Sequence, residues 1–454
     1  MRQRNVLLVS YHFPPMGGSG VQRALKLAKY LPDAGWQAHV LCAGHTHLPL
    51  LDVSLVDELV GRAAVHPVCG WEAGALARTL CGHLRTGPSG GKRLGEIEDR
   101  LYWRLHGWIA RLGLPEQELL WAPAAIRRAR ELIPRRSIGA VVTSSPPLSC
   151  HLVGWSLARR MGLPWIADLR DPIVDNFAAQ DARGPERLFR RWIEGLAVRN
   201  ARRLVVTCPE LADRLAARYP DVPVGRFATI TNGFDPGDAP APAARTVGER
   251  FVLAYIGSFY RQQSIAPILE AVRLLRVRRP DIGARLELRM VGSLAASQQH
   301  HVQADDDAFF RRLGYQPHRT AIAEMASADA LLLATPLEHG GRYCIPAKTF
   351  EYLAFGGHVI AFVHAGTAAS RMLSDAGGCT ILRDGSTSEW SGAIETCFDA
   401  WQAGTLAHTR RRGAIERFDR LAVAKEYATV INRCVDGSSL IRLGDEEVVD
   451  KEAA

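Results

Sequence analysis

A lysine and a glutamate stand one helical turn apart in the stretch CIPAKTFEYLAFGG (residues 344–357). Pro346 favours the start of a helix, which places Lys348 in the first turn and Glu351 in the next. A helix N-terminus with a lysine can hold a diphosphate, and a glutamate can accept paired hydrogen bonds from ribose hydroxyls. The alternative is a pair of solvated helix residues. Because the helix follows the predicted strand ADALLLATP, we favour the binding role.

A glycine-rich loop lies near the start of the chain, in SYHFPPMGGSGVQRALKLAKYLPDAGW (residues 10–36). Gly17, Gly18 and Gly20 separate a short apolar strand from an amphipathic helix, so backbone N–H groups there can approach a ligand without hindrance from a Cβ atom. The loop is not a dinucleotide fingerprint, because Arg23 stands where a small residue belongs and VLCAG ends without an acidic residue. It predicts either a surface for phosphate or sugar hydroxyls or a plain tight turn.

Two polar clusters imitate metal sites. The run ADDDAFF, with Asp305, Asp306 and Asp307, has the form of an acidic D-x-D metal motif, but it falls in a polar loop and is interpreted as a solvated run of charges. His300 and His301 are adjacent, which is not the spacing of metal ligands. We therefore predict neither a metal site nor another cofactor.

The elements that would position these residues form two successive α/β units. The predicted strands of the first unit alternate with helical patterns, and they are NVLLVS, AHVLCA, IGAVVTSS, LPWIADLRDP, RRLVVTCPE and FATITNGF. After a Pro/Ala/Gly-rich stretch the alternation restarts with FVLAYIGS, LELRMVGS, ADALLLATP and HVIAFV. Repeated βαβ units predict two Rossmann-like, doubly wound parallel sheets. Ligands bind beyond the carboxyl ends of such strands, so we expect the domains to face an interdomain cleft.

The expected domain boundaries follow from the same pattern. The N-terminal domain spans residues 1–236, a linker spans 237–249, and the C-terminal domain spans 250–415. A last helix at 416–437 is expected to pack back on the N-terminal domain, although it could pack on either half. Residues 438–454 are predicted to form an acidic, disordered tail, since DEEVVDKEAA holds five acids and one lysine.

Composition limits the classes of function. The chain has 454 residues and a net charge of +9, so it suits an anionic partner such as nucleotide phosphates or a phospholipid surface. Nucleic acid is disfavoured because no binding module is recognisable. The nine cysteines are scattered without C-x-x-C spacing, and no apolar run has the length of a membrane span or a signal peptide. These features predict a cytoplasmic protein, at most peripheral at the inner face of the plasma membrane.

Five stretches, in order, resemble family-four glycosyltransferases of the GT-B fold, and most closely bacterial enzymes that build surface polysaccharides. They are the glycine-rich opening, SSPPLSCHLVGWSLARRMGLPWIADLRDP, TNGFDP, GYQPHRTAIAEMASADALLLA and IPAKTFEYLAFG, and the resemblance runs from about residue 5 to about residue 435. It implies transfer of a sugar from a nucleotide-diphosphate donor with retention of anomeric configuration, without a metal. The implied pathway is exopolysaccharide or lipopolysaccharide assembly.

The resemblance places the donor nucleotide on the C-terminal domain. Glu351 matches the second glutamate of the family's paired-glutamate motif, which holds the ribose, but the position of the first glutamate is Tyr343. Backbone amides of Gly340 and Gly341 are then expected to contact the donor sugar.

The family's phosphate-holding arginine and lysine follow the first strand of the second domain, here in YIGSFYRQQS. Gly257 lies at the end of this strand and is expected to contact the donor. Ser258 and Gln263 occupy the positions of the two cations, so Arg261 is expected to replace both. A surface arginine without a ligand is the alternative.

In the N-terminal domain, many relatives carry a histidine after the strand that here reads PWIADLRDP. Arg170 and Asp171 stand there instead. We expect Asp171 to contact acceptor or donor hydroxyls and Arg170 to supply charge, while Asp168 braces the loop. A buried Asp–Arg pair that only locks the loop is the alternative.

The acceptor is expected to be a glycan, free or linked to a polyprenyl diphosphate. RLYWRLHGWIARLG (residues 100–113) has an apolar stripe flanked by arginines, which is typical of a helix at an anionic membrane surface. The alternative is a helix that covers its own core.

Two other functions stay open at this point. A nucleotide-sugar 2-epimerase uses a similar two-domain cleft, although the quoted stretches resemble transferases. A non-catalytic partner in polysaccharide assembly would explain the missing first glutamate and the missing Arg/Lys pair.

Overall fold

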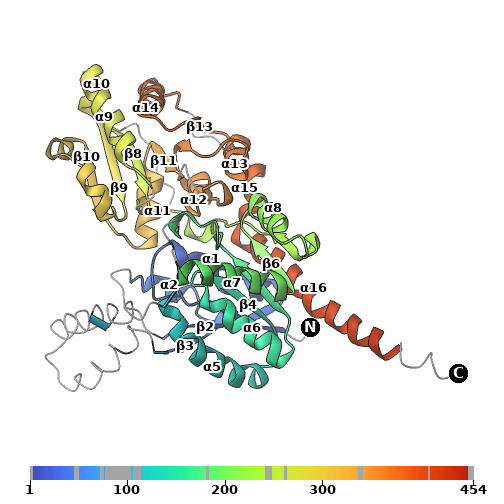
Figure 1. Cartoon of the computed structure of the whole chain (residues 1–454). Helices are drawn as coiled ribbons and strands as arrows, with labels where there is room; N and C mark the ends of the chain where they lie inside the picture. The colour runs from blue at the N-terminus through green and yellow to red at the C-terminus, as the bar shows by residue number, and fades with distance from the viewer. Residues whose placement is uncertain are drawn as a thin grey trace.

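The structure is a computed structural model of the chain. It describes residues 4–44, 51–71, 76, 104–105, 114–179, 182, 184–240, 248–259, 263–335, 341–406 and 410–447. Figure 1 shows two lobes, an N-terminal lobe in blue and green and a C-terminal lobe in yellow and orange. Each lobe is built around one parallel sheet.

The N-terminal sheet has seven strands in the order β3-β2-β1-β4-β5-β6-β7, all parallel. The strands are β1 (Arg4–Val9), β2 (Trp36–Ala43), β3 (Ala63–Val68), β4 (Ile138–Ser145), β5 (Trp165–Leu169), β6 (Arg203–Val206) and β7 (Phe227–Thr229). The described helices of this lobe are α1 (Ser19–Tyr30), α2 (Ser54–Asp57), α5 (Ala122–Arg135), α6 (Ser149–Met161), α7 (Pro185–Asn200) and α8 (Pro209–Arg218).

The C-terminal sheet has six parallel strands in the order β10-β9-β8-β11-β12-β13. They are β8 (Phe251–Ile256), β9 (Leu286–Val291), β10 (Phe310–Gly314), β11 (Ala330–Ala334), β12 (His358–Phe362) and β13 (Cys379–Leu382). The described helices are α9 (Ala266–Arg278), α10 (Pro280–Arg285), α11 (His318–Ser327), α12 (Lys348–Phe355), α13 (Ala368–Ala376), α14 (Thr387–Gln402) and α15 (Arg412–Ile415).

Both sheets are buried on two faces, which explains their continuous apolar strands. In the N-terminal lobe, α5, α6 and α7 cover one face, while α1 and the last helix cover the other. In the C-terminal lobe, α9 and α14 pack on one face and α11, α12 and α13 on the other. The strand order reverses direction next to β1 and β8, as in a Rossmann fold. The predicted pair of doubly wound α/β domains is therefore confirmed.

The last helix, α16 (Arg420–Glu447), returns to the N-terminal lobe. Val423, Ala424, Tyr427 and Ile431 are buried in the same cluster as α1 and the strands β1 and β2. The helix continues to Glu447, beyond the predicted end at residue 437, and its last turns extend past the lobe in Figure 1. The prediction of a disordered tail from residue 438 is therefore wrong as far as Glu447.

The described helices include none that is both long enough and apolar enough to cross a membrane.

Candidate active site at the domain seam

The carboxyl ends of the two sheets face each other across a seam. The Oδ2 atom of Asp52, which follows β2, accepts a hydrogen bond of 2.8 Å from the backbone N–H of His318, which follows β10. Glu210, just after β6, accepts one of 2.6 Å from the backbone N–H of Ala368, after β12. The backbone of Gly18, after β1, is hydrogen-bonded to the phenol of Tyr315, after β10. These contacts all join residues beyond strand ends, where ligands of parallel sheets bind.

Lys348 lies in this seam without a carboxylate partner among the described residues. Its Nζ atom lies 3.4 Å from the centroid of the Tyr255 ring, at the end of β8. Gly257 follows with φ +123°, and a Cβ atom there would lie 3.5 Å from the Lys348 Nζ. Burial lowers the pKa of Lys348 well below its ordinary value, because no neighbouring carboxylate opposes the loss of hydration. An ammonium in this state gains most from an incoming anion.

Glu351 is held by His318 rather than left free. The Nε2 atom of His318 donates a hydrogen bond of 3.0 Å to the Oε1 atom of Glu351, and both side chains are largely buried. Burial alone would lower the pKa of His318, but the hydrogen bond and charge of Glu351, with the charge of Asp238, raise it above its ordinary value. Glu351 is therefore oriented by a second residue of its own domain.

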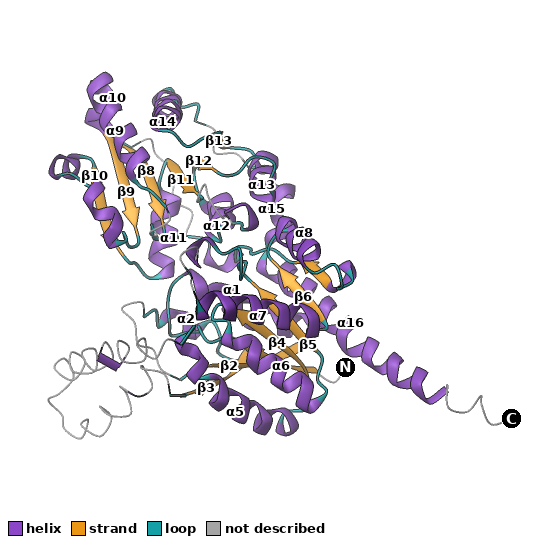
Figure 2. Cartoon of the chain, in the orientation of Figure 1, coloured by secondary structure: helices purple, strands orange, loops and turns teal. Residues whose placement is uncertain are grey.

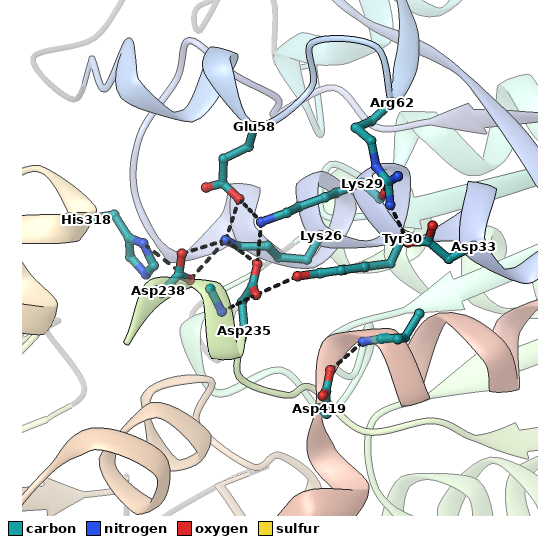
Figure 3. Close-up of polar contacts among 12 residues, drawn as sticks. Lys26, Lys29, Tyr30, Asp33, Glu58, Arg62, Asp235, Asp238, His318 and Asp419 are labelled. Atoms are coloured by element: carbon teal, nitrogen blue, oxygen red, sulfur yellow. Dashed lines mark hydrogen bonds and ion pairs between the residues drawn. The ribbon is translucent and has the colours of Figure 1, made fainter. Parts of the chain in front are cut away.

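Beside His318, an acidic cluster joins the N-terminal lobe to the linker. Figure 3 shows Glu58, Asp235 and Asp238 gathered around the ammonium groups of Lys26 and Lys29. The Nζ atom of Lys26 lies 2.7 to 2.9 Å from an oxygen of each carboxylate. Oxygens of these carboxylates lie within 4.8 Å of one another, a spacing that suits a metal ion, but the ammonium groups of the two lysines already bind them. The cluster fixes the start of the linker to α1.

The glycine loop after β1 is fixed by Arg170. The guanidinium donates to the carbonyl oxygens of Ser145 (2.8 Å) and Pro146 (2.5 Å), and also to that of Gly20. Its donors thus bind three backbone carbonyls, and the side chain is 7% exposed. Gly18 has φ +91°, which only glycine adopts without strain. Arg170 therefore ties the loop of Gly17 and Gly18 to the loop after β4.

Arg23, the residue that breaks the dinucleotide fingerprint, forms a buried ion pair with Asp168. The two side chains are 3% and 1% exposed and approach to 2.9 Å. Arg23 also donates to the Ile230 carbonyl and to the Tyr427 hydroxyl of α16, and Ser144 donates to Asp168. This network joins α1, β4, β5 and α16.

Asp171 follows β5 directly, and its carboxylate stays available at the seam. No described residue forms a hydrogen bond or ion pair with it. Burial raises its pKa, while the charge of Arg170 opposes that shift. Its own charge raises the pKa of the Cys344 thiol in the other lobe, an effect second to that of burial. Asp171 therefore faces the C-terminal lobe at the seam.

A hollow of about 340 Å³ opens at the same seam. It lies between Glu210, Asp213 and Arg214 of the N-terminal lobe and Arg342, Tyr343 and Thr367 of the C-terminal lobe. The Arg214 guanidinium carbon lies 6.0 Å from the Tyr343 ring centroid. Tyr343, at the position of the missing glutamate, thus lines an interdomain space.

Some expected site residues lie elsewhere or outside the described ranges. Ser258 is hydrogen-bonded to Ser293 (2.7 Å) and Gln263 donates to the Ala334 carbonyl (3.1 Å), so both have local partners. Gly341 is buried in the turn that leads to Tyr343. Arg261, Gly340 and residues 100–103 and 106–113 lie outside the described residues.

Sequence reasoning missed four residues that shape the seam, and they are Asp52, Glu210, Tyr315 and His318. Tyr315 and His318 lie in the quoted stretch GYQPHRTAIAEM, directly after β10. Their position beyond a strand end was the available signal.

Two Rossmann-like domains that face each other across strand ends define the GT-B class of fold. Residues 17–233 of this chain match the family described as glycosyl transferase 4-like domain. The N-terminal half of the chain is thus similar to this family of glycosyltransferases.

Curated relatives cover part of the chain. A D-inositol 3-phosphate glycosyltransferase of Paenarthrobacter aurescens (strain TC1) is 28% identical over 278 residues, which are 57% of this chain and 65% of that protein. A protein of the same name from Streptomyces avermitilis is 24% identical over 308 residues, 65% of this chain and 58% of that protein. The chain thus spans less than two thirds of the length of either relative.

Solved structures share the fold over nearly the whole chain. HepE of Anabaena, in complex with UDP and glucose, superposes with a TM-score of 0.62 at 14% identity, covering 94% of this chain and 99% of that one. Sucrose-phosphate synthase of Thermosynechococcus elongatus superposes with a TM-score of 0.62 at 14% identity, covering 96% of this chain and 100% of that one. A trehalose-phosphate synthase of Burkholderia xenovorans, in complex with glucose-6-phosphate, gives 0.60 at 10% identity, with 94% and 100% covered.

Proposed function

We propose that this protein transfers a sugar from a nucleotide diphosphate to an acceptor hydroxyl, with retention of anomeric configuration and without a metal ion. The observation that carries the proposal is Lys348, a partly buried ammonium with no carboxylate partner among the described residues, placed at the seam beside Gly257. A diphosphate is the kind of dianionic group that such a site stabilises. The match of residues 17–233 to a glycosyl transferase 4-like domain and the shared fold with UDP-bound HepE support a nucleotide-sugar donor.

The roles of the residues follow from their positions. Lys348 and the first turn of α12 bind the diphosphate, and Glu351, oriented by His318, accepts hydrogen bonds from the ribose. In the transfer, the bond between the anomeric carbon and the diphosphate oxygen breaks, and the acceptor oxygen bonds to that carbon on the same face. The acceptor proton passes to the departing diphosphate, whose developing charge Lys348 stabilises. Asp171 binds a sugar hydroxyl from the N-terminal side.

The decisive experiment measures the melting temperature with UDP-, GDP- and dTDP-sugars in the presence of EDTA. The wild type is expected to be stabilised by one nucleotide class. Lys348→Met and Glu351→Gln should each lose about tenfold or more in affinity. Lys425→Met and Glu416→Gln are the matched controls, because Lys425 and Glu416 are exposed and hold no ion pair in the described chain. Equal affinity of Lys348→Met and wild type would remove the donor-site assignment.

Product analysis tests the reaction class. A retaining transferase releases free nucleotide diphosphate and gives a product with the donor's anomeric configuration, which NMR reads from the coupling at the anomeric carbon. Release of an epimerised nucleotide sugar would instead show the 2-epimerase, and the absence of nucleotide binding would show a non-catalytic partner.

We further propose that the acceptor is a glycan, carried on a polyprenyl diphosphate at the inner face of the plasma membrane, in exopolysaccharide or lipopolysaccharide assembly. The resemblance of five stretches to enzymes of bacterial surface polysaccharides supports this acceptor. The competing class of acceptor is a soluble sugar or inositol phosphate. It is suggested by the relatives named for inositol 3-phosphate and by the neighbour bound to glucose-6-phosphate. Labelled donor incubated with a lipid extract or with sugar phosphates separates the two, since only a lipid-linked product enters the organic phase.

A further inference from the structure

Helix α7 exposes two large apolar side chains that nothing in the described structure covers. Leu188 is 69% exposed and Trp192 is 52% exposed, and they lie one turn apart. Arg187 and Arg191 are exposed beside them, again one turn apart. The neighbouring Phe189 packs inward on the core, so the helix is anchored by its other side. The exposed stripe therefore combines apolar and basic side chains on one helix.

The surface around this stripe is strongly basic. Helix α6 packs between α5 and α7, and Figure 2 shows the three helices side by side across the N-terminal lobe. These helices contain three carboxylates, Glu131, Glu186 and Glu194, and each is paired with an arginine. Seven exposed arginines on the same helices hold no ion pair among the described residues, and they are Arg127, Arg130, Arg135, Arg159, Arg160, Arg187 and Arg191. We call these seven arginines with Leu188 and Trp192 the α5–α7 face.

A helix of the other lobe shows that an exposed apolar side chain does not by itself make such a face. On α9, Leu274 is 41% exposed and Val277 is 83% exposed. There, however, Arg273 is paired with Asp306, and Arg278 with Glu395. Two of the three arginines of α9 are thus paired within the protein, whereas no arginine of the α5–α7 face holds an ion pair among the described residues. An unbalanced basic surface attracts an anionic partner.

The direction of α7 brings its apolar stripe close to the seam. Strand β5 ends at Leu169 on the carboxyl edge of the sheet, and α7 runs back antiparallel to it before β6 begins. The first turns of α7, with Leu188 and Trp192, therefore lie toward the edge that carries Asp171. A partner bound here lies near the acceptor side of the proposed reaction.

We propose that the α5–α7 face docks on an anionic phospholipid bilayer, with Leu188 and Trp192 inserted among the headgroups. Tryptophan and leucine flanked by arginines are the side chains that interfacial binding requires, since the apolar groups enter the interface while the guanidinium groups meet lipid phosphates. A purely electrostatic partner such as nucleic acid would use the arginines but gain nothing from Leu188 and Trp192. The placement near the acceptor side rests on the proposed function, but the docking itself does not.

The test is sedimentation of the full chain with vesicles of phosphatidylcholine alone or mixed with phosphatidylglycerol. We expect binding to the mixed vesicles only, weakened by salt. The double variant Leu188→Ser/Trp192→Ser should bind about tenfold or more weakly. Arg187→Gln/Arg191→Gln should also bind less and show a flatter salt dependence. The matched control Leu274→Ser/Val277→Ser should bind as the wild type does.

Several outcomes would overturn the proposal. They are no binding to mixed vesicles, equal binding to phosphatidylcholine, wild-type binding by Leu188→Ser/Trp192→Ser, or an equal loss in the α9 control. Thermal unfolding checks that each variant is folded, and nucleotide-sugar binding is measured on the same samples. A wild type that binds nucleotide sugar but not the mixed vesicles contradicts only the docking proposal. A wild type that binds the mixed vesicles but no nucleotide sugar contradicts only the proposed function.

Discussion

The two Rossmann-like domains use their seam cations in opposite ways. In the N-terminal domain, the Arg170 guanidinium donates hydrogen bonds to the backbone carbonyls of Ser145, Pro146 and Gly20. In the C-terminal domain, Lys348 lies on the Tyr255 ring with no carboxylate partner among the described residues. The first cation holds a loop in place, and the second is left for a ligand.

This difference shows how one architecture divides its tasks. A buried donor that is fully satisfied adds rigidity, whereas a buried charge that is not satisfied costs stability and persists only where it serves binding. Arg23 and Asp168 extend the rigid network of the N-terminal domain to α16. The C-terminal domain instead keeps its unsatisfied charge at the end of β8. We therefore expect substitution of the seam cation to lower stability in the N-terminal domain and to abolish donor binding in the C-terminal domain.

Arg170→Met should give the largest effect on stability. It removes the donors for three backbone carbonyls and leaves Asp171 without the neighbouring charge of Arg170, so we expect a loss of about 3 kcal/mol in the free energy of unfolding. Urea unfolding followed by circular dichroism measures it. Arg191→Met, on an exposed unpaired arginine, is the control and should change the free energy by less than about 0.5 kcal/mol. If Arg170→Met is as stable as the wild type but inactive, Arg170 takes part in the reaction. The two domains would then not differ in the use of their seam cations.

Lys348→Met should change the free energy of unfolding in the opposite direction to Arg170→Met. Replacing a desolvated ammonium by an apolar chain of similar length is expected to raise the free energy of unfolding by about 1 kcal/mol, while donor binding is lost. The pKa of Lys348 is lowered in the folded protein, so the cost of its charge is present at neutral pH and shrinks as the pH rises toward 10.5. Unfolding of both proteins at pH 7 and pH 10 checks the sign. Destabilisation by Lys348→Met would mean that Lys348 is a structural residue like Arg170.

His318→Gln tests the support of Glu351 through its pH dependence. The pKa of His318 is raised above 6.5 in the folded protein, so its contribution is fully present below pH 6.5 and is lost as the pH rises through the folded value. We expect the free energy of unfolding of the wild type to exceed that of His318→Gln by about 1 kcal/mol at pH 6, and by less at pH 9. Thermal unfolding across this range measures it. A difference that is constant with pH would show that the imidazole acts by shape alone.

The fold and the donor-side residues could be predicted from the sequence because their signals are local. Continuous apolar strands and the helical period of 3.6 residues can be recognised in short windows, and Lys348 and Glu351 share one helix. Asp306 shows the limit of such reasoning. Its acidic run indicated a solvated loop, yet Asp306 is buried and pairs with Arg273 of α9, 33 residues away in the sequence.

The seam contacts could not be predicted, since they join positions that only the tertiary structure brings together. Asp52 and His318 are 266 residues apart, and Glu210 and Ala368 are 158 apart. Arg23 was recognised as an exception to a glycine motif, but its partners Asp168 and Tyr427 lie 145 and 404 residues further along. One sequence gives no information on which distant polar residues meet.

Glu210→Gln should give the smallest effect, because it weakens only a contact between the domains. Its carboxylate accepts from the Ala368 N–H and from Arg371, which is 55% exposed. An exposed ion pair is worth up to about 1 kcal/mol, so the change should lower donor affinity about two- to fivefold by shifting the population toward separated domains. Asp213→Asn, in the same hollow but without a contact across the seam, should leave affinity unchanged. Because the ion pair that is weakened is partly exposed, the melting temperature without donor should barely move. A large fall in that temperature would show that the domains unfold as one unit, so that rigidity and binding could not be divided between them.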